Sequence, residues 1–167
     1  MSMTAGANLY YGCVLLTDEE WQVEEADEYG DLNPETHSWL DTDNRGEDEE
    51  TDLLEIMHER LLAGVGFTEK DGEFAEFAKR KRDAEKKLGV VIKPTGHDEV
   101  PGYVLVIDQD VKDRITVDWS EVMEVYPAEL IQNVENDWDA KIAAALRCLE
   151  LTPKQKDPSW LLCVHYY

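Results

Sequence analysis

The chain has 167 residues and carries 38 acidic against 16 basic residues, for a formal net charge of −22. Its length suits one domain that folds around a single core without a metal or a disulfide, and its apolar blocks exclude global disorder. Its charge argues against nucleic acid and anionic membranes as direct ligands, because their phosphates would repel it. A protein with a basic surface is the natural charged partner.

The cysteines and the N-terminus bear on the cellular compartment. Cys13, Cys148 and Cys163 are odd in number, lie far apart and have apolar neighbours, which predicts buried, reduced thiols. The N-terminus lacks a basic region followed by an apolar core, and no run reaches the roughly 18 apolar residues of a membrane span. The sequence therefore predicts a cytoplasmic protein without a signal peptide or membrane span, and nothing in it calls for a cofactor.

The first predicted element is a strand at residues 9–16. Its side chains are apolar on both faces, so we expect it at the centre of a sheet that is covered on both sides. Thr17 and Glu20 then form a capping box, which predicts a short helix anchored by Trp21 and Val23.

Residues 24–48 are rich in acids and contain turn signals, among them Gly30 and Pro34. We expect an irregular excursion with one helical turn at residues 34–40, where Trp39 and Leu40 would attach it to the core.

Two amphipathic helices follow. Residues 50–63 carry apolar side chains at helical spacing behind an acidic first turn. A second helix at residues 71–88 should end at Gly89. Its buried stripe would consist of Phe74, Phe77, Ala78, Ala84 and Leu88.

Strands return after the second helix. Residues 90–92 and 103–107 read as strands that flank an irregular hairpin loop, residues 93–102, which contains both Pro and Gly. Residues 114–117 alternate in polarity and predict a short edge strand, whereas residues 118–125 fit either a strand or a helical turn.

Two further helices precede the C-terminus. Pro127 suits the first position of a short helix that ends at residue 134, and Asn136 or Asp137 caps a second one. The apolar face of the second helix comprises Trp138, Ile142, Ala145, Leu146 and Leu149.

Residues 159–167 are so apolar and aromatic that they would aggregate if they stayed free. We expect them to pair in the interior of the sheet, beside the first or the third strand. The pattern as a whole predicts a single α+β domain with a four- or five-stranded, mostly antiparallel sheet and helices packed on it. Residues 18–50 would be an acidic, partly irregular insertion between the first strand and the first helix.

The first strand contains Tyr10, Tyr11 and Gly12, and the chain closes with the sequence Trp160-Leu-Leu-Cys-Val-His-Tyr-Tyr167 after a helix that contains Trp138. With the charged excursion between them, this order resembles small uncharacterised proteins encoded by tailed bacteriophages. The resemblance covers the first strand and the second half of the chain and includes no catalytic motif. It implies a phage or prophage setting, and hence the host cytoplasm, but no activity.

Most of the charge lies in the acidic segment, residues 18–55, which holds seventeen acids and one base, Arg45. Laid along a helix, carboxylates at this density would be roughly 3.3 Å apart, close to the ~3.4 Å between phosphates on one DNA strand. Such a surface could imitate nucleic acid in a basic groove, with Trp21, Tyr29 and Trp39 as apolar anchors. The competing explanation is a solubilising, partly disordered loop.

We therefore predict an acidic, non-enzymatic interaction protein, in its sharpest form a phage-derived nucleic-acid mimic that inhibits a host protein. It would bind a basic surface of that partner. The predicted partner-binding residues are Trp21, Glu24, Glu25, Asp27, Glu28, Asp31, Trp39, Asp41, Asp43, Glu47, Asp48, Glu49 and Glu50.

A calcium-binding module is one alternative. Asp41, Asp43, Glu49 and Asp52 occupy the first, third, ninth and twelfth positions of an EF-hand-like loop that has Gly46 at its sixth. Two features depart from the pattern, because Arg45 places a cation where an oxygen ligand belongs and Asp52 replaces a bidentate Glu. A solvated turn is the competing interpretation.

A small enzyme is a second alternative, with His97 and Asp98 as adjacent base and carboxylate on the hairpin loop. The other histidines, His37, His58 and His165, are isolated and form no zinc-binding pair. A homodimer completed through the apolar strands is a further alternative.

The second predicted helix carries the chain's main basic cluster, residues 79–82 with Lys86 and Lys87. We interpret it as a solvated face whose cations complement the helix dipole, and some of these bases would neutralise the acidic segment.

Overall fold

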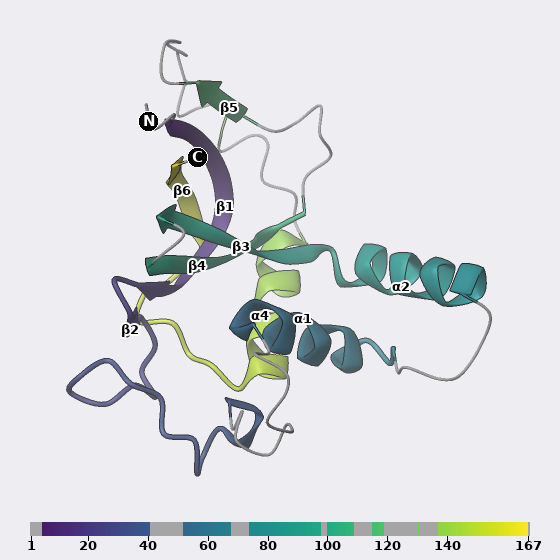
Figure 1. The fold of residues 1–167 in the computed structure, drawn as a ribbon, viewed down its shortest axis with the longest axis horizontal. Coiled ribbons are helices and arrows are strands. Elements are labelled where there is room, and N and C mark those ends of the chain that lie inside the picture. Colours follow the sequence, from purple (N-terminus) through teal and green to yellow (C-terminus); the bar gives the residue numbers. More distant parts are fainter. Residues whose placement is uncertain are drawn as a thin grey trace.

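The structure is a computed structural model that describes residues 5–40, 52–67, 74–97, 100–108, 115–118, 130 and 137–166. A curled, mostly antiparallel sheet with helices packed against it confirms the predicted α+β class (Figure 1). The strands are β1 (Ala5–Thr17), β2 (Glu20–Trp21), β3 (Val90–His97), β4 (Val100–Ile107), β5 (Ile115–Asp118) and β6 (Ser159–Tyr166). The helical elements are η1 (Ser38–Leu40), α1 (Leu53–Gly64), α2 (Phe74–Leu88) and α4 (Trp138–Leu149).

Strand β1 is the centre of the sheet, as its apolar faces predicted. Its first half pairs with β6 along one edge and with β5 along the other, and its second half pairs with β4 and β2. The sheet order is β2-β1-β4-β3-β6, and a bridge between Gly96 and His165 joins β3 to β6. Since β6 also pairs with β1, the sheet curls back on itself.

The curl depends on a close approach of strands at Gly12. This residue pairs with Val106 of β4 and with Ser159 of β6. A Cβ atom added there would clash with the carbonyl oxygen of Leu105. The Tyr-Tyr-Gly sequence therefore needs its glycine because no side chain fits where the strands meet.

The side-chain amide of Gln155 takes the place of a strand beside β1, between the segments that pair with β6 and with β2. Its Nε2 donates to the carbonyl oxygen of Gly12 (3.1 Å), and its Oε1 accepts from the backbone N–H of Val14 (3.5 Å). These contacts satisfy backbone groups that would otherwise lack a ladder partner.

Apolar side chains cover both faces of the central strands. Tyr11, Cys13 and Leu15 of β1 belong to the main core, which also contains buried residues of α1 and α4. Val104 and Val106 of β4 point to the opposite face, where they form a second cluster with Cys163 of β6. On β1 itself, Tyr10 and Val14 pack against this second cluster but are only partly buried, so the first strand is covered fully on one side and partly on the other.

An aromatic cluster in the main core connects three elements that are far apart in the sequence. The ring of Tyr11 in β1 lies 5.5 Å from Trp138 of α4 and 5.6 Å from Trp160 of β6. The Tyr11 hydroxyl donates to Asp139 Oδ1 at 2.8 Å. Burial and this carboxylate raise the pKa of Tyr11 to about 12, so the phenol stays protonated.

Helices α1 and α4 pack on the sheet through the apolar faces that their spacing predicted. Helix α1 begins after Asp52, whose Oδ1 accepts from the backbone N–H of Leu54 (3.0 Å) as an N-cap. Its buried residues are Ile56, Met57, Leu61 and Leu62, and those of α4 are Trp138, Ile142, Ala145 and Leu149. Asp137 precedes α4 but makes no side-chain cap, because its carboxylate pairs with Lys141 instead (2.8 Å).

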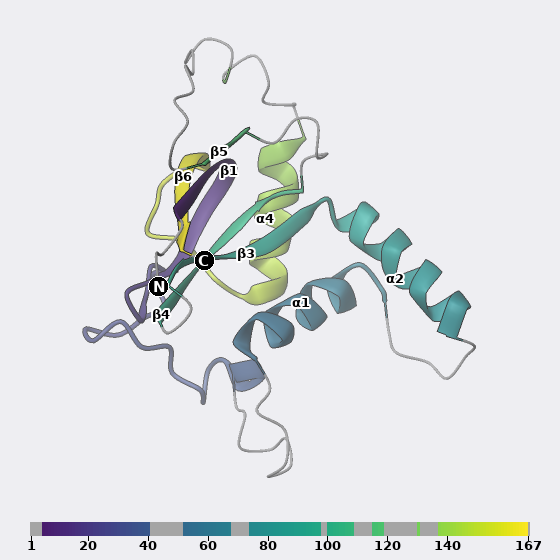
Figure 2. The same cartoon turned by 45° about the horizontal axis from the view of Figure 1, so that its top comes forward.

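Helix α2 projects from the body of the molecule, at an angle to α1 (Figures 1 and 2). Two contacts join α2 to the residues that follow α1. Lys87 Nζ donates to the carbonyl oxygen of Val65 (3.2 Å), and the rings of Phe67 and Phe77 lie 5.6 Å apart. Leu88 at its end is buried, and Gly89 follows with a φ of +65°, as expected of a helix stop.

The irregular loop predicted at residues 93–102 is wrong. Strands β3 and β4 pair from Val90 with Ile107 out to His97 with Val100, so their hairpin continues through Pro94, Gly96 and Pro101. Proline and glycine are tolerated in a strong ladder where a strand curls or loses a neighbour, and a turn signal read from composition alone misses this.

The C-terminal residues pair with the first strand, which is one of the two positions that the sequence predicted for them. Strand β6 pairs with β1 from Ala5 with Tyr166 to Gly12 with Ser159. The face that carries Trp160 is not covered along its whole length, however, because Leu162 is 70% and Val164 38% exposed. The strand is thus paired inside the sheet, but the later part of this face is open.

Some expectations fall outside the described residues. These include the helix predicted at residues 127–134, of which only residue 130 is described, and residues 119–125 after the end of β5. In the ranges that are described, no helix combines the length and apolar character needed to cross a bilayer.

Candidate functional site

The first part of the acidic segment begins with a tight hairpin turn. Asp18 and Glu19 have positive φ angles of 50° and 66°, and the next residues form β2, in which Trp21 pairs with Leu16. The helix predicted from the capping box of Thr17 and Glu20 is therefore wrong. Burial of Trp21, which is only 7% exposed, favours a return of the chain along β1 over a helix with two apolar anchors.

The chain is then fixed against the segment that follows α4. Val23 is fully buried and forms a β-bridge with Pro153, flanked by hydrogen bonds from Glu24 N to Thr152 O (2.7 Å) and from Lys154 N to Gln22 O (2.9 Å). This short antiparallel contact attaches the backbone of residues 22–24 to the segment that follows α4.

The carboxylate of Glu25 contributes to the fold and is the only one of residues 18–40 that is partly buried. Its Oε2 accepts from the backbone N–H of Thr152 at 2.9 Å. Partial burial acts to raise the pKa of Glu25, but the hydrogen bonds from Thr152, with a smaller contribution from His37, outweigh it and lower the pKa. The ionised form of Glu25 is therefore stabilised by the fold.

A second turn presents the next group of acids. Asp27 Oδ1 accepts from the backbone N–H groups of Tyr29 (2.8 Å) and Asp31 (3.0 Å), and Gly30 adopts a φ of +85°. The carbonyl oxygen of Gly30 accepts from Trp21 N at 2.8 Å, and Leu32 is buried. The turn thus holds Tyr29, 74% exposed, at its tip.

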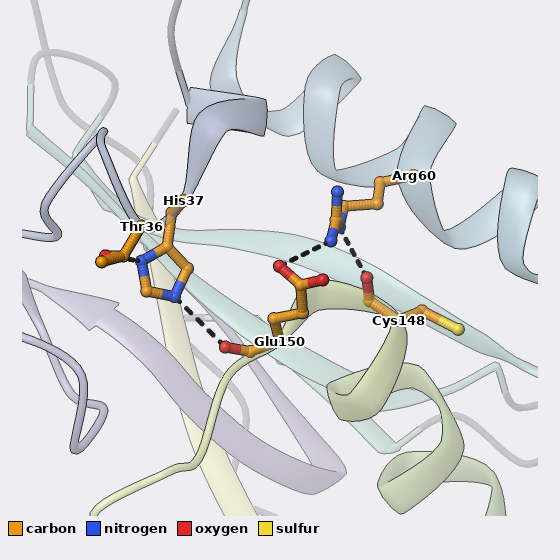
Figure 3. Close-up of polar contacts among 5 residues, drawn as sticks. All are labelled: Thr36, His37, Arg60, Cys148 and Glu150. Atoms are coloured by element: carbon orange, nitrogen blue, oxygen red, sulfur yellow. Dashed lines mark hydrogen bonds and ion pairs between the residues drawn. The ribbon is translucent and has the colours of Figure 1, made fainter.

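His37 anchors the end of the segment (Figure 3). Its ring is 5% exposed, with Nδ1 3.1 Å from Thr36 Oγ1 and Nε2 3.2 Å from the carbonyl oxygen of Glu150. Because a carbonyl oxygen only accepts, the Nε2 atom carries a proton in this contact. His37 is thus a buried residue that holds the end of the segment to the body of the protein.

Arg60 of α1 completes the anchor. Its Nη2 lies 2.9 Å from Glu150 Oε2, and its Nε donates to the carbonyl oxygen of Cys148 at 2.6 Å (Figure 3). The guanidinium also stacks over Trp39 of η1, 5.4 Å from the ring centroid, and Trp39 meets Trp21 edge to face at 6.4 Å. The predicted attachment of Trp39 and Leu40 to the core is confirmed.

Eight of the nine carboxylates between residues 18 and 40 are exposed, and no Lys or Arg lies in that stretch. In the part of the chain that the structure describes, none of the nine is within ion-pair distance of a base. We call the eight exposed groups the acidic surface: Asp18, Glu19, Glu20, Glu24, Asp27, Glu28, Asp31 and Glu35.

The predicted partner-binding residues divide into three groups. Glu24, Asp27, Glu28 and Asp31 are exposed and belong to the acidic surface, and their role in binding stays a prediction. Trp21 is buried, while Glu25 and Trp39 are partly buried, and all three serve the fold. Asp41, Asp43, Glu47, Asp48, Glu49 and Glu50 lie outside the described residues.

The sequence analysis overlooked four members of the acidic surface, namely Asp18, Glu19, Glu20 and Glu35. The first three belong to the β1–β2 hairpin, where the capping box predicts a helix. Glu35 follows Asn33, whose Oδ1 accepts from the Glu35 backbone N–H (2.8 Å), an Asx turn that the Asn-Pro pair could have indicated.

The alternative sites find no support in the described residues. Of the four calcium candidates Asp41, Asp43, Glu49 and Asp52, only Asp52 is described, and its carboxylate caps α1. No group of three or more His, Cys, Asp or Glu side chains gathers as a metal site within the described ranges. Asp98 of the enzyme hypothesis lies outside those ranges, so its contact with His97 stays a prediction.

The thiols are structural. Cys13 and Cys163 are buried, and burial raises the pKa of both to about 11, so neither is a reactive thiolate. Cys148 is free as well. No disulfide joins the three cysteines, and Cys13 and Cys163 are buried as predicted, whereas Cys148 is only partly buried.

Comparison with known proteins gives no family assignment: no protein-family model matches this chain, and neither a curated protein nor a solved structure matches it. The resemblance to phage-encoded proteins stays a prediction.

Proposed function

We propose that the protein binds, through the acidic surface, a partner protein whose own surface is basic, and that it competes there with nucleic acid. The carrying observation is the group of eight exposed carboxylates, none of them within ion-pair distance of a base in the described residues, on a stretch of backbone that buried side chains hold in place. A phage-encoded inhibitor of a host nucleic-acid-binding protein is the sharpest form of this proposal.

The anchoring of the backbone supports binding. Trp21, Val23, Leu32 and His37 are all buried, so the turns that present the carboxylates are formed before a partner arrives. Binding then costs less conformational entropy than it would if a loose acidic loop had to become ordered on the partner. Tyr29 stands exposed among the acids and supplies an aromatic contact of the kind that dominates interface energies.

The electrostatics point the same way. Unpaired carboxylates keep their full field in solution and speed the encounter with a basic surface. The bases of α2 do not quench this field by direct contact, because no ion pair joins them to the acidic surface in the described residues. A partner that normally binds phosphates offers the complementary charge.

The test uses two variants with the same change in net charge. The surface variant combines Glu24→Gln, Glu28→Gln, Asp31→Asn and Glu35→Gln, which are exposed and whose side chains make no hydrogen bond that holds the turns in the described residues. The control variant combines Glu76→Gln, Asp83→Asn, Asp108→Asn and Asp157→Asn, which are exposed elsewhere.

Each protein is immobilised and exposed to bacterial extract at about 50 mM and about 200 mM salt, the range over which electrostatic binding falls steeply. We expect the wild type and the control variant to capture the same proteins at low salt, and the surface variant to lose them. The captured protein, once purified, should release bound DNA when the wild-type chain is added. Equal capture by all three chains would contradict the claim that the acidic surface binds the partner. Capture without DNA release would contradict the claim that the protein competes with nucleic acid.

A further inference from the structure

A cavity of about 650 Å³ lies between α1, α2 and β3. Figure 2 shows the two helices diverging from each other at this place. Ligand pockets in proteins are usually about 300–1,000 Å³, so the space is large enough for a small organic molecule. His58 of α1 lines the cavity, whereas neither Arg60 nor the acidic surface does.

The walls of the cavity are mainly apolar. Phe67 and Phe77 contribute two aromatic rings 5.6 Å apart and tilted by 60°. The remaining apolar lining comes from Leu54, Leu62, Ala63, Val91 and Ile92. Two tilted rings above an aliphatic floor fit a flat or aromatic body of a ligand.

The polar lining is predominantly anionic. Among the described residues, it contains the carboxylates of Asp52, Glu55 and Glu59 and the ammonium of Lys81. Asp52 is engaged as the cap of α1, and Glu55 is exposed at the next turn of the same helix. A ligand that extends from the aromatic rings toward the start of α1 therefore meets negative charge.

His58 lies in this lining, 3.8 Å from Glu85 Oε1 of α2. Burial and the nearby charge of Lys81 lower its pKa, while Glu85, Glu59 and Glu55 oppose the change. The imidazole is therefore neutral at pH 7, offers a hydrogen bond, and does not add positive charge to the cavity.

We propose that this cavity binds a small organic cation with an aromatic body, an arylalkylamine in chemical class. The ring packs against Phe67 and Phe77, and the ammonium group lies toward Glu55. This proposed site is independent of the acidic surface, because none of residues 18–40 lines the cavity.

Three probes of similar shape and different charge test it: protonated phenethylamine, neutral 2-phenylethanol and anionic phenylpropionate. Binding is followed by shifts of backbone amide resonances in a two-dimensional NMR titration of the full chain. We expect the amine to bind most tightly, the alcohol less tightly and the anion least, with shifts confined to α1, α2 and β3.

Variants separate the two halves of the site. Glu55→Gln should weaken the amine about two- to fivefold, the effect of one exposed charge pair, and leave the alcohol unchanged. Glu76→Gln, on α2 but not in the lining, is the matched control and should change neither. Phe77→Leu should weaken amine and alcohol alike, and its amide spectrum shows whether α2 keeps its place. No shifts at α1 and α2, or equal affinity for all three probes, would overturn the proposal.

Discussion

The acidic stretch at residues 18–40 and helix α2 are both highly charged, yet they are built in different ways. Helix α2 follows its apolar period; Lys79, Arg82 and Lys86 are exposed, whereas Arg80 and Lys81 are partly buried. Residues 18–40 have no period and take their course from four buried side chains and a few backbone hydrogen bonds. In both, the charge sets what the surface presents, while a small number of apolar residues sets where the backbone goes.

The largest expected effect breaks the acidic stretch at its aromatic anchor. Trp21→Ala should lower the free energy of unfolding by about 3–5 kcal/mol, because it removes a buried indole from the main core. Phe77→Ala in α2 should cost clearly less, since its ring is only partly buried. Equilibrium urea unfolding measures both, and equal losses would mean that residues 18–40 are attached no more firmly than α2.

A smaller loss is expected at Arg60. Arg60→Met keeps the aliphatic packing but removes the contacts to Glu150 and to the Cys148 carbonyl, at a cost of about 1.5–3 kcal/mol. Arg60→Lys should lie between Met and wild type, because an ammonium can reach Glu150 but cannot stack over Trp39 as a planar group. Near-ultraviolet circular dichroism of the tryptophans should change in both. If Lys fully replaced Arg, the stacking would contribute nothing.

The smallest effect is a pH dependence that belongs to the acidic stretch alone. The folded state lowers the pKa of Glu25, so Glu25 contributes stability above its unfolded pKa of about 4.5, and this contribution is lost as pH falls through the folded pKa. Glu25→Gln should therefore be less stable than wild type at pH 7 and converge with it in acid. Thermal melts from pH 3 to pH 7 measure the difference, and Glu24→Gln, whose side chain is exposed, is the control. A constant offset at all pH values would contradict the role of the carboxylate.

The sequence predicted the parts of the fold in which one pattern dominates. The apolar faces of β1, the period of α1 and α4, and the pairing of the C-terminal strand with β1 all follow from side chains in single runs. The β1–β2 hairpin could not be found this way, because Thr17 and Glu20 match a helix cap locally. Only burial of Trp21 beside Leu16 decides for the strand, and that contact is tertiary.

The candidate site was predictable in charge but not in geometry. Acid density located Glu24, Asp27, Glu28 and Asp31, and all four are exposed in the structure. The aromatic residues were harder, because Trp21 and Trp39 have the same acidic neighbours as Tyr29 and yet pack inward against each other and Arg60. What separates them is the return of the chain to residues 150–153, which no local pattern encodes.

The central claim is that the carboxylates of residues 18–40 are presented to a basic partner and are not neutralised within the molecule. The most direct measurement is the salt dependence of affinity for a lysine-rich peptide, compared between the surface variant and the control variant defined above. Counterions are released for each charge contact, so the slope of log affinity against log salt reports the number of contacts. The account predicts that the control variant keeps the wild-type slope and that the surface variant loses most of it. Equal slopes for the two variants would contradict it.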